Sequence, residues 1–283
     1  TFQGQYAEKD EETGWNAFEL RSYDARVGRW MTIDPYREFH SPYLAFGNQP
    51  HQVVDFDGGC TTCPDEVYVV LANHVYGAQV GDVTSHGWEV IDVTDNPSGL
   101  YGALYRGTAD SGFEGQYIYA TAGTEDLKKD GVEDLLQVFG ESAQYSESVE
   151  IAHSLAEEYN EISFTGHSLG GGLASANALA TETKAVTFTA AGLSGLTRKN
   201  LGLNGNSADI TSYIVEGEIL DKVQRNTGLR AEANLRIMLP SVGKNTFDKH
   251  KMGNVQDAFR IYQELIQMSD RTFIIDNTDP PRP

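Results

Sequence analysis

The chain has 283 residues, 40% of them hydrophobic, with a formal net charge of −20 and a pI near 4.6. This length and apolar content are sufficient for the core of one large domain or two smaller ones. The charge argues against nucleic acid as a partner, because phosphate binding needs a basic face, and it would also repel a strongly anionic bilayer.

No apolar run approaches the roughly 20 residues that span a bilayer, and no basic-then-apolar signal segment opens the chain. We therefore expect a soluble globular protein. It starts at Thr1 within sequence typical of folded structure, so we expect a piece of a longer protein.

A break is expected near residues 57–65, where turn formers and small polar residues follow one another. Both cysteines, Cys60 and Cys63, lie in this segment. A zinc site would need two more ligands at suitable spacing, so we interpret the pair as linker thiols, with a redox pair as the alternative. The sequence predicts no metal and no cofactor, and two parts, residues 1–59 and 60–283.

The first part combines aromatic residues with turn signals at intervals that predict short β-strands. It resembles the end of the Rhs or YD-repeat core of polymorphic toxins. The residues that carry the resemblance include Gly28-Arg29-Trp30, Ile33-Asp34-Pro35 and Val54-Asp55-Phe56-Asp57-Gly58. The resemblance covers nearly all of residues 1–59 and implies a segment that closes a β-cage just before a variable toxin domain.

In some members of that family an aspartyl autoprotease cuts at this junction. Asp34 and Asp55 match the positions of the family's Asp-Pro motifs, although Phe56 stands where proline is usual. Two roles therefore stay open for these aspartates, a self-cleaving pair and the capping of turns.

The second part alternates helical and strand patterns. A helix is expected around residues 67–75, where apolar residues recur at helical spacing. Further helices are expected over 132–139, 145–159, 173–180 and 255–266, and strands over 88–93, 100–105, 116–122, 162–166, 185–189 and 211–215. This alternation predicts an α/β fold with a mostly parallel sheet covered by helices.

The most informative motif is Gly166-His167-Ser168-Leu169-Gly170. It lies between an expected strand and a Gly- and Ala-rich expected helix, which is the arrangement of a nucleophile elbow. Glycines flank the serine in such an elbow because the turn leaves no room for side chains. The start of the following helix also offers backbone N–H groups to an oxyanion. The motif therefore predicts that Ser168 is the nucleophile of a serine hydrolase.

A serine nucleophile needs a histidine base oriented by a carboxylate, and here both partners follow the serine, the acid first. Only His250 follows Ser168 among the histidines, so it is the expected base. The acid should lie just past the strand at 211–215, which leaves Glu218 and Asp221. Proximity to the strand end favours Glu218, and the frequency of aspartate in triads favours Asp221. We prefer Glu218 and keep Asp221 open.

The second part also resembles the class 3 lipases, through Phe164-Thr165-Gly166-His167-Ser168-Leu169-Gly170-Gly171, the later His250 and Ala120-Thr121-Ala122-Gly123-Thr124. The resemblance implies an α/β-hydrolase fold and lipid-ester hydrolysis. It also implies an oxyanion hole made by the Leu169 backbone N–H and by a threonine after a strand-ending glycine. We choose Thr124 for that threonine, with Thr108 as the alternative.

Together the two resemblances imply the C-terminal end of an Rhs-type toxin that carries a phospholipase or lipase. Such effectors are delivered by a secretion apparatus, for example type VI, into competing bacteria, where they attack membrane phospholipid, and the producer carries an immunity protein. The alternatives are a carboxylesterase or thioesterase acting on soluble esters, and an inactive hydrolase fold that serves as an adaptor.

Overall fold

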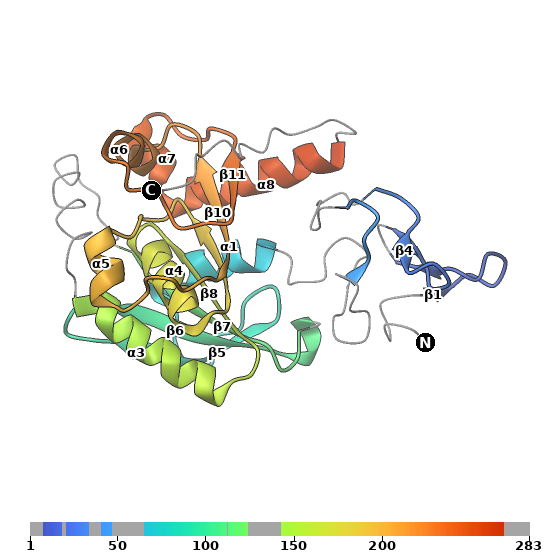
Figure 1. Ribbon diagram of the computed structural model, residues 1–283, viewed down its shortest axis with the longest axis horizontal. Helices are drawn as coiled ribbons and strands as arrows, with labels where there is room; N and C mark the ends of the chain where they lie inside the picture. The colour runs from blue at the N-terminus through green and yellow to red at the C-terminus, as the bar shows by residue number, and fades with distance from the viewer. Residues whose placement is uncertain are drawn as a thin grey trace. The chain divides into compact units, whose positions relative to one another are not determined.

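The computed structural model describes residues 8–18, 21–33, 41–46, 65–111, 113–123 and 143–268. The chain divides into two compact units, Thr1–Pro64 and Asp65–Pro283 (Figure 1). Several features predicted from the sequence lie outside the described residues: Asp34, Asp55, Cys60, Cys63, Thr124 and the helix over 132–139.

The first unit contains a four-stranded antiparallel sheet in the order β1-β2-β3-β4. Its strands are Glu8–Lys9, Asn16–Ala17, Ser22–Asp24 and Arg29–Trp30. Phe18, Tyr23, Trp30 and Phe46 pack their rings together, with centroids 4.9–6.3 Å apart, and form the core. The short strands and aromatic core confirm the β-rich character predicted for this part.

The second unit is built on a seven-stranded sheet in the order β11-β10-β9-β8-β7-β6-β5. Strands β7 to β11 are parallel, and β5 and β6 are antiparallel to their neighbours. Their bounds, from β5 to β11, are Trp88–Asp95, Tyr101–Gly107, Tyr117–Thr121, Ile162–His167, Lys184–Phe188, Asp209–Val215 and Leu235–Leu239. This confirms the predicted mostly parallel α/β sheet.

The helices of the second unit are α1 (Asp65–His74), α3 (Ala143–Glu158), α4 (Leu169–Thr181), α5 (Gly195–Asn200), α6 (Ile219–Thr227), α7 (Thr246–His250) and α8 (Met252–Met268). Two short 3-10 helices, Val75–Gly77 and Ala109–Ser111, complete the described elements. None of the described helices is both long and apolar enough to cross a bilayer.

Alternation along β8 assigns the helices to the two faces of the sheet. The Thr165 hydroxyl oxygen lies 3.3 Å from the Tyr68 carbonyl oxygen on α1, so this residue faces α1. Its neighbour Phe164 points the other way, into a core that includes Leu173 of α4 and Tyr145 of α3. Helices α1 and α4 therefore cover opposite faces, and β8, which ends at the nucleophile motif, is buried on both.

Candidate active site

Ser168 occupies the turn between β8 and α4 that the sequence predicted. Its backbone has φ 59° and ψ −126°, a conformation that non-glycine residues rarely adopt, and it is fully buried. A Cβ added at Gly166 would collide with the carbonyl oxygen of Gly170, and one added at Gly170 with the carbonyl oxygen of Thr121. Both flanking glycines are therefore required by close backbone approach.

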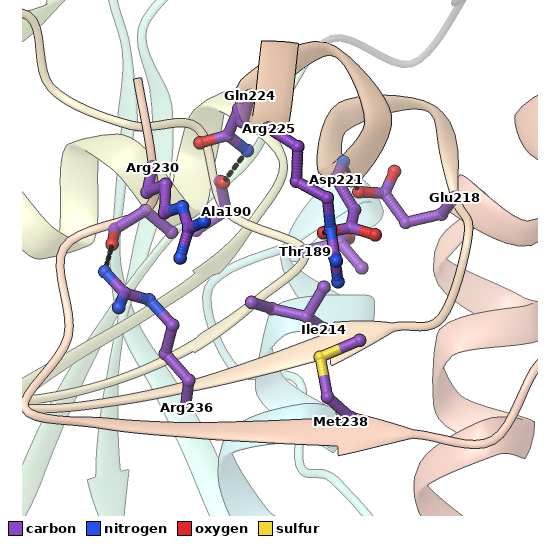
Figure 2. Close-up of a pocket in the computed structure, with 11 residues that line it drawn as sticks. Thr189, Ala190, Ile214, Glu218, Asp221, Gln224, Arg225, Arg230, Arg236 and Met238 are labelled. Carbon is purple, nitrogen blue, oxygen red and sulfur yellow. Dashed lines mark hydrogen bonds and ion pairs between the residues drawn. The ribbon is translucent and has the colours of Figure 1, made fainter. Parts of the chain in front are cut away.

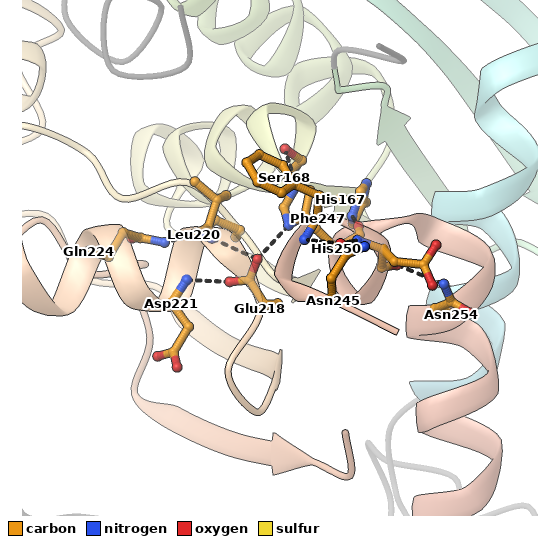
Figure 3. A network of polar contacts seen from close by, with 12 residues as sticks. His167, Ser168, Glu218, Leu220, Asp221, Gln224, Asn245, Phe247, His250 and Asn254 are labelled. Carbon is orange, nitrogen blue, oxygen red and sulfur yellow. Dashed lines mark hydrogen bonds and ion pairs between the residues drawn. The ribbon is translucent and has the colours of Figure 1, made fainter. Parts of the chain in front are cut away.

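His250 contacts Ser168 on one side and Glu218 on the other (Figure 3). Its Nε2 lies 2.8 Å from Ser168 Oγ, and its Nδ1 lies 2.6 Å from Glu218 Oε2. The exposed fractions of His250 and Glu218 are 2% and 1%. The three side chains thus form one buried hydrogen-bonded chain, in the arrangement of a serine-histidine-acid triad.

The contacts of Glu218 determine which atom donates in each of these two hydrogen bonds. Glu218 caps the start of α6, where its carboxylate accepts hydrogen bonds from the backbone N–H groups of Leu220, at 2.7 Å, and Asp221. Because an ionised carboxylate only accepts, the proton between Glu218 and His250 belongs to His250 Nδ1. Nε2 is then free to accept the proton of the Ser168 hydroxyl, which is the tautomer a general base needs.

The other acid candidate, Asp221, has a different partner. Its Oδ1 accepts a hydrogen bond from Arg225 Nε at 2.7 Å, in an i,i+4 pair on α6. Its contribution to the site is the backbone N–H that it donates to Glu218. The structure therefore brings Glu218, rather than Asp221, to His250.

A second chain of hydrogen bonds supports the site and was not predicted. His167 Nε2 lies 2.7 Å from the backbone oxygen of His250, and its Nδ1 lies 3.0 Å from the Tyr76 hydroxyl. Burial, followed by the proximity of His250, lowers the pKa of His167 well below its usual value of 6.5, so the ring is neutral. With Nε2 as donor, Nδ1 accepts from Tyr76, whose oxygen accepts from the Gly123 N–H at 3.1 Å.

This series of hydrogen bonds, through Tyr76 and His167, links the end of β7 to the backbone of His250. Tyr76 and His167 lie far apart in the sequence, and each side chain taken alone is an ordinary polar core residue. The one feature of the sequence that could have indicated a role for His167 in the site is its position directly before Ser168.

The Leu169 backbone N–H, at the first position of α4, has no partner within its own helix and adjoins Ser168. Gly123 also adjoins the serine, since a Cβ added there would lie 3.1 Å from Ser168 Cβ. Thr124 follows directly but lies outside the described residues.

Thr108, the alternative oxyanion threonine, lies at the opposite end of the strands from Ser168. It follows β6, which runs antiparallel to β7, so the end of β6 lies beside the start of β7. Its hydroxyl donates to the Gly87 carbonyl oxygen at 2.7 Å. Thr108 is therefore not placed to contact an oxyanion formed at Ser168.

In the described parts of the chain, no group of three or more His, Cys, Asp or Glu side chains is arranged to hold a metal ion.

The comparison with family models decides the classification of this domain. The model described as Phospholipase-like, Tle-like phospholipase domain, matches residues 67–270, most of the chain. The chain belongs to this family. The second unit is therefore a Tle-like phospholipase domain, and the serine elbow, His250 and Glu218 all lie within the matched residues.

Two curated proteins share parts of this sequence. The extracellular phospholipase A1 of Serratia liquefaciens is 37% identical over 156 residues, which are 52% of this chain and 47% of that protein. Salivary gland surface protein 1 of Aedes aegypti is 38% identical over 74 residues, 26% of this chain and 2% of that protein. The chain thus matches about half the length of the first relative and a small fraction of the second.

Among solved structures, a triacylglycerol lipase from Penicillium expansum matches the Tle-like chain with a TM-score of 0.46 and 13% identity, over 68% of this chain and 87% of that one. The Rhizomucor miehei lipase propeptide complex matches with a TM-score of 0.44 and 13% identity, over 62% and 67% of the two chains.

Proposed function

We propose that this Tle-like domain is a serine-dependent phospholipase. The observation that carries the proposal is the buried hydrogen-bonded chain from Ser168 through His250 to Glu218. Membership of a phospholipase-like family and the name of the Serratia liquefaciens relative support the choice of a lipid ester as substrate.

In the proposed reaction, Ser168 Oγ attacks the carbonyl carbon of an ester while His250 Nε2 takes the hydroxyl proton. Glu218 stabilises the imidazolium that forms. The Leu169 N–H, and by our sequence prediction Thr124, hold the tetrahedral oxyanion. The proton on His250 then passes to the leaving alcohol, and a water molecule, deprotonated by His250, releases the fatty acid and restores Ser168.

The direct test measures fatty acid released from phosphatidylcholine vesicles by the wild-type chain and by Ser168→Ala. We expect release by the wild type and a loss of at least about 10³-fold in the variant. A fluorophosphonate probe should label wild-type protein at Ser168. Labelling with release only from short soluble esters would indicate a carboxylesterase or thioesterase instead, and absence of both labelling and release would indicate an inactive adaptor.

We further propose that the enzyme acts as an antibacterial effector, with Asp34 and Asp55 as the candidate self-cleavage residues of an Rhs core. Support comes from the resemblance of residues 1–59 to the Rhs core. On this proposal the Rhs cage and a secretion apparatus deliver the domain into a target cell, where it reaches membrane phospholipid from the periplasm or the cytoplasm, and a cognate immunity protein protects the producer.

The effector proposal is tested by producing the wild type and Ser168→Ala in either compartment of a bacterial host, with growth and lipid mass spectrometry as readouts. Wild-type protein should stop growth and convert phospholipid to lysophospholipid, whereas Ser168→Ala should do neither. Equal growth with both proteins in both compartments would contradict the effector role without affecting the enzymatic one.

A further inference from the structure

The backbone that follows β7 lies beyond the hydrogen bonds of the sheet. β7 pairs with β8 as far as Thr121 and Gly166. Two residues after Thr121, Gly123 donates its backbone N–H to a side chain, the Tyr76 hydroxyl, at 3.1 Å. A backbone N–H inside a protein needs a partner, and where the sheet pairing ends Tyr76 provides it.

Gly123 is packed directly against the nucleophile. A Cβ added there would lie 2.6 Å from the His167 carbonyl oxygen and 3.1 Å from both Ser168 Cβ and the Tyr76 hydroxyl oxygen. The first of these distances is too short for any side chain, so only glycine allows this close approach. Thr124, the oxyanion threonine predicted from the sequence, is the next residue. A displacement of Gly123 would therefore displace the backbone that leads into the predicted oxyanion hole.

The same hydroxyl is connected to the candidate base through one imidazole ring. Tyr76 donates to His167 Nδ1 at 3.0 Å, and His167 Nε2 donates to the His250 carbonyl oxygen at 2.7 Å. The direction of both bonds follows because a carbonyl oxygen only accepts and the neutral His167 ring has one donor. The centroids of the two imidazole rings are 4.8 Å apart. Tyr76 is thus joined to both sides of the reaction centre, at Gly123 and at His250.

The 3-10 helix that carries Tyr76 is itself fixed to this region. Tyr101, the first residue of β6, donates from its hydroxyl to the Ala78 carbonyl oxygen at 2.9 Å. The carbonyl oxygen of Tyr101 accepts the Ala122 N–H, also at 2.9 Å. Tyr101 therefore joins the end of that 3-10 helix to the residue before Gly123. This arrangement holds the Tyr76 hydroxyl in place before any substrate binds, as a preorganised active site requires.

His250 is held at two points by different parts of the sheet. Its Nδ1 contacts Glu218, which follows β10 and lines a pocket of about 670 Å³, open space at its mouth included, together with residues of α6 and β11 (Figure 2). Its carbonyl oxygen contacts His167, the last residue of β8. Neither Tyr76 nor His167 lines that pocket. A change at Tyr76 is therefore expected to leave the contact between Glu218 and His250 in place.

We propose that Tyr76 is a positioning residue of the reaction, whose hydroxyl fixes the backbone at Gly123 relative to His250. It acts directly on the oxyanion side and through His167 on the side of the base. This inference rests on the proposed phospholipase function. The charges on the oxyanion and on His250 develop only towards the transition state, so loss of this positioning should lower kcat and leave KM nearly unchanged. A misplacement of about 1 Å in such groups can lower the rate about 100-fold.

The test compares Tyr76→Phe with Tyr68→Phe in the full chain, with p-nitrophenyl butyrate as the ester. Tyr68 is the matched control, because it lies on α1 and its hydroxyl contacts Ser163 Oγ at 3.0 Å, near the start of β8 and away from the nucleophile. Each substitution removes one hydroxyl and keeps the ring. We expect kcat to fall about 10- to 100-fold in Tyr76→Phe with KM within about twofold of the wild type, and neither constant to change in Tyr68→Phe. Melting temperatures verify that both variants fold.

Two further measurements separate positioning from a general loss of stability. The affinity for a trifluoromethyl ketone, which forms a tetrahedral adduct with Ser168, should fall in Tyr76→Phe by about the same factor as kcat/KM. Hydrogen exchange of the Gly123 amide should become about tenfold faster in Tyr76→Phe and stay unchanged in Tyr68→Phe. The exchange measurement needs no substrate, so it is independent of the proposed function.

Tyr101→Phe is the second variant, in case Tyr76→Phe does not fold. It removes the bond to the Ala78 carbonyl oxygen and keeps the Tyr76 hydroxyl. Because the 3-10 helix is then held less firmly, kcat should fall about threefold or more while KM stays unchanged. An unchanged kcat in folded Tyr101→Phe would then overturn the proposal.

The kinetics of the variants decide between a positioning role and a structural one. A loss of kcat in Tyr76→Phe alone, with weaker binding of the ketone, supports the positioning role. An unchanged kcat in Tyr76→Phe, or an equal loss in Tyr68→Phe, overturns it. A rise in KM with kcat unchanged also overturns it and makes Tyr76 a substrate contact. A wild-type chain that hydrolyses no ester contradicts the proposed phospholipase, and hydrogen exchange at Gly123 still decides whether Tyr76 holds that backbone.

Discussion

At the residue scale, Glu218 has two structural roles that its sequence neighbour Asp221 does not share. It caps α6 and it holds His250 Nδ1 inside the protein. Both roles use acceptor oxygens, so an amide in place of the carboxylate would present N–H groups to His250 and favour the wrong tautomer.

We therefore expect Glu218→Gln to lower kcat by about 10⁴-fold, the usual cost of a misdirected triad histidine. Asp221→Asn removes an ion pair with an arginine that is 57% exposed, so it should cost at most about 1 kcal/mol of stability and far less activity. The measurement is kcat on a soluble ester, with melting temperatures for both variants. A larger loss of kcat in Asp221→Asn than in Glu218→Gln would assign the acid role to Asp221, and equal losses would contradict the distinction between the two residues.

His167 is expected to make the stability of the domain depend on pH. Its pKa lies well below 6.5 in the folded chain, mainly because of burial, and returns to about 6.5 on unfolding. Below pH 6.5 the unfolded chain then binds a proton that the folded chain does not. The free energy of unfolding should fall as the pH drops below 6.5, by up to about 1.4 kcal/mol per pH unit, until the folded-state pKa is reached.

Urea unfolding between pH 7.5 and 5 tests this expectation, with His167→Gln as the test variant. Glutamine keeps an N–H donor for the His250 carbonyl but does not titrate. The exposed His153, changed to Gln, is the matched control. Wild type and His153→Gln should lose stability in parallel as the pH falls, and His167→Gln should lose less. An equal pH dependence of the free energy of unfolding in all three proteins would contradict the assignment of this effect to His167.

At the scale of elements, the crossing of β7 against the start of α4 is the tightest point of the elbow. Gly170 lies against the Thr121 and Ala122 backbone, with no space for a methyl group. Gly170→Ala should therefore destabilise the domain by about 3 kcal/mol and displace Ser168. Gly195, near the start of α5, has open space around it, so Gly195→Ala should be neutral or slightly stabilising. The measurement is the melting temperature of both variants. Equal melting temperatures would contradict the prediction that Gly170 is required by close backbone approach and Gly195 is not.

Elements with a strong periodic pattern could be predicted, and those without it could not. The expected strand at 162–166 is β8, and the expected terminal helix at 255–266 is α8. β11 was missed because Arg236, its second residue, interrupts the apolar run. Among the described strands it lies at the edge of the sheet and pairs with β10 alone. α6 was missed because only Leu220 and Gln224 of its residues are buried.

The residues of the site also fall into those that could be predicted from the sequence and those that could not. Ser168 and His250 could be predicted because one lies in a local motif and the other is the only histidine downstream. Glu218 and Asp221 remained ambiguous because their difference is the direction of two side chains within one turn of helix. The contact of Tyr76 with His167 joins residues that are 91 positions apart, and no local pattern encodes it.

At the scale of the whole molecule, the net charge of −20 acts on a charged bilayer over about one Debye length. That length falls from about 30 Å at 10 mM salt to about 8 Å at 150 mM. Salt should therefore help the domain to reach an anionic membrane, because it screens the repulsion between the two negative charges.

We expect hydrolysis of phosphatidylglycerol vesicles to speed up several-fold between about 10 and 150 mM salt, because repulsion from the surface is screened. Phosphatidylcholine vesicles, which carry no net charge, should show little change. Monomeric dihexanoyl phosphatidylglycerol is the matched control, because it has the same headgroup without a charged surface, and its kcat/KM should change much less than the vesicle rate. A vesicle rate that falls with salt would mean that a local cationic surface attracts the bilayer more strongly than the net charge repels it.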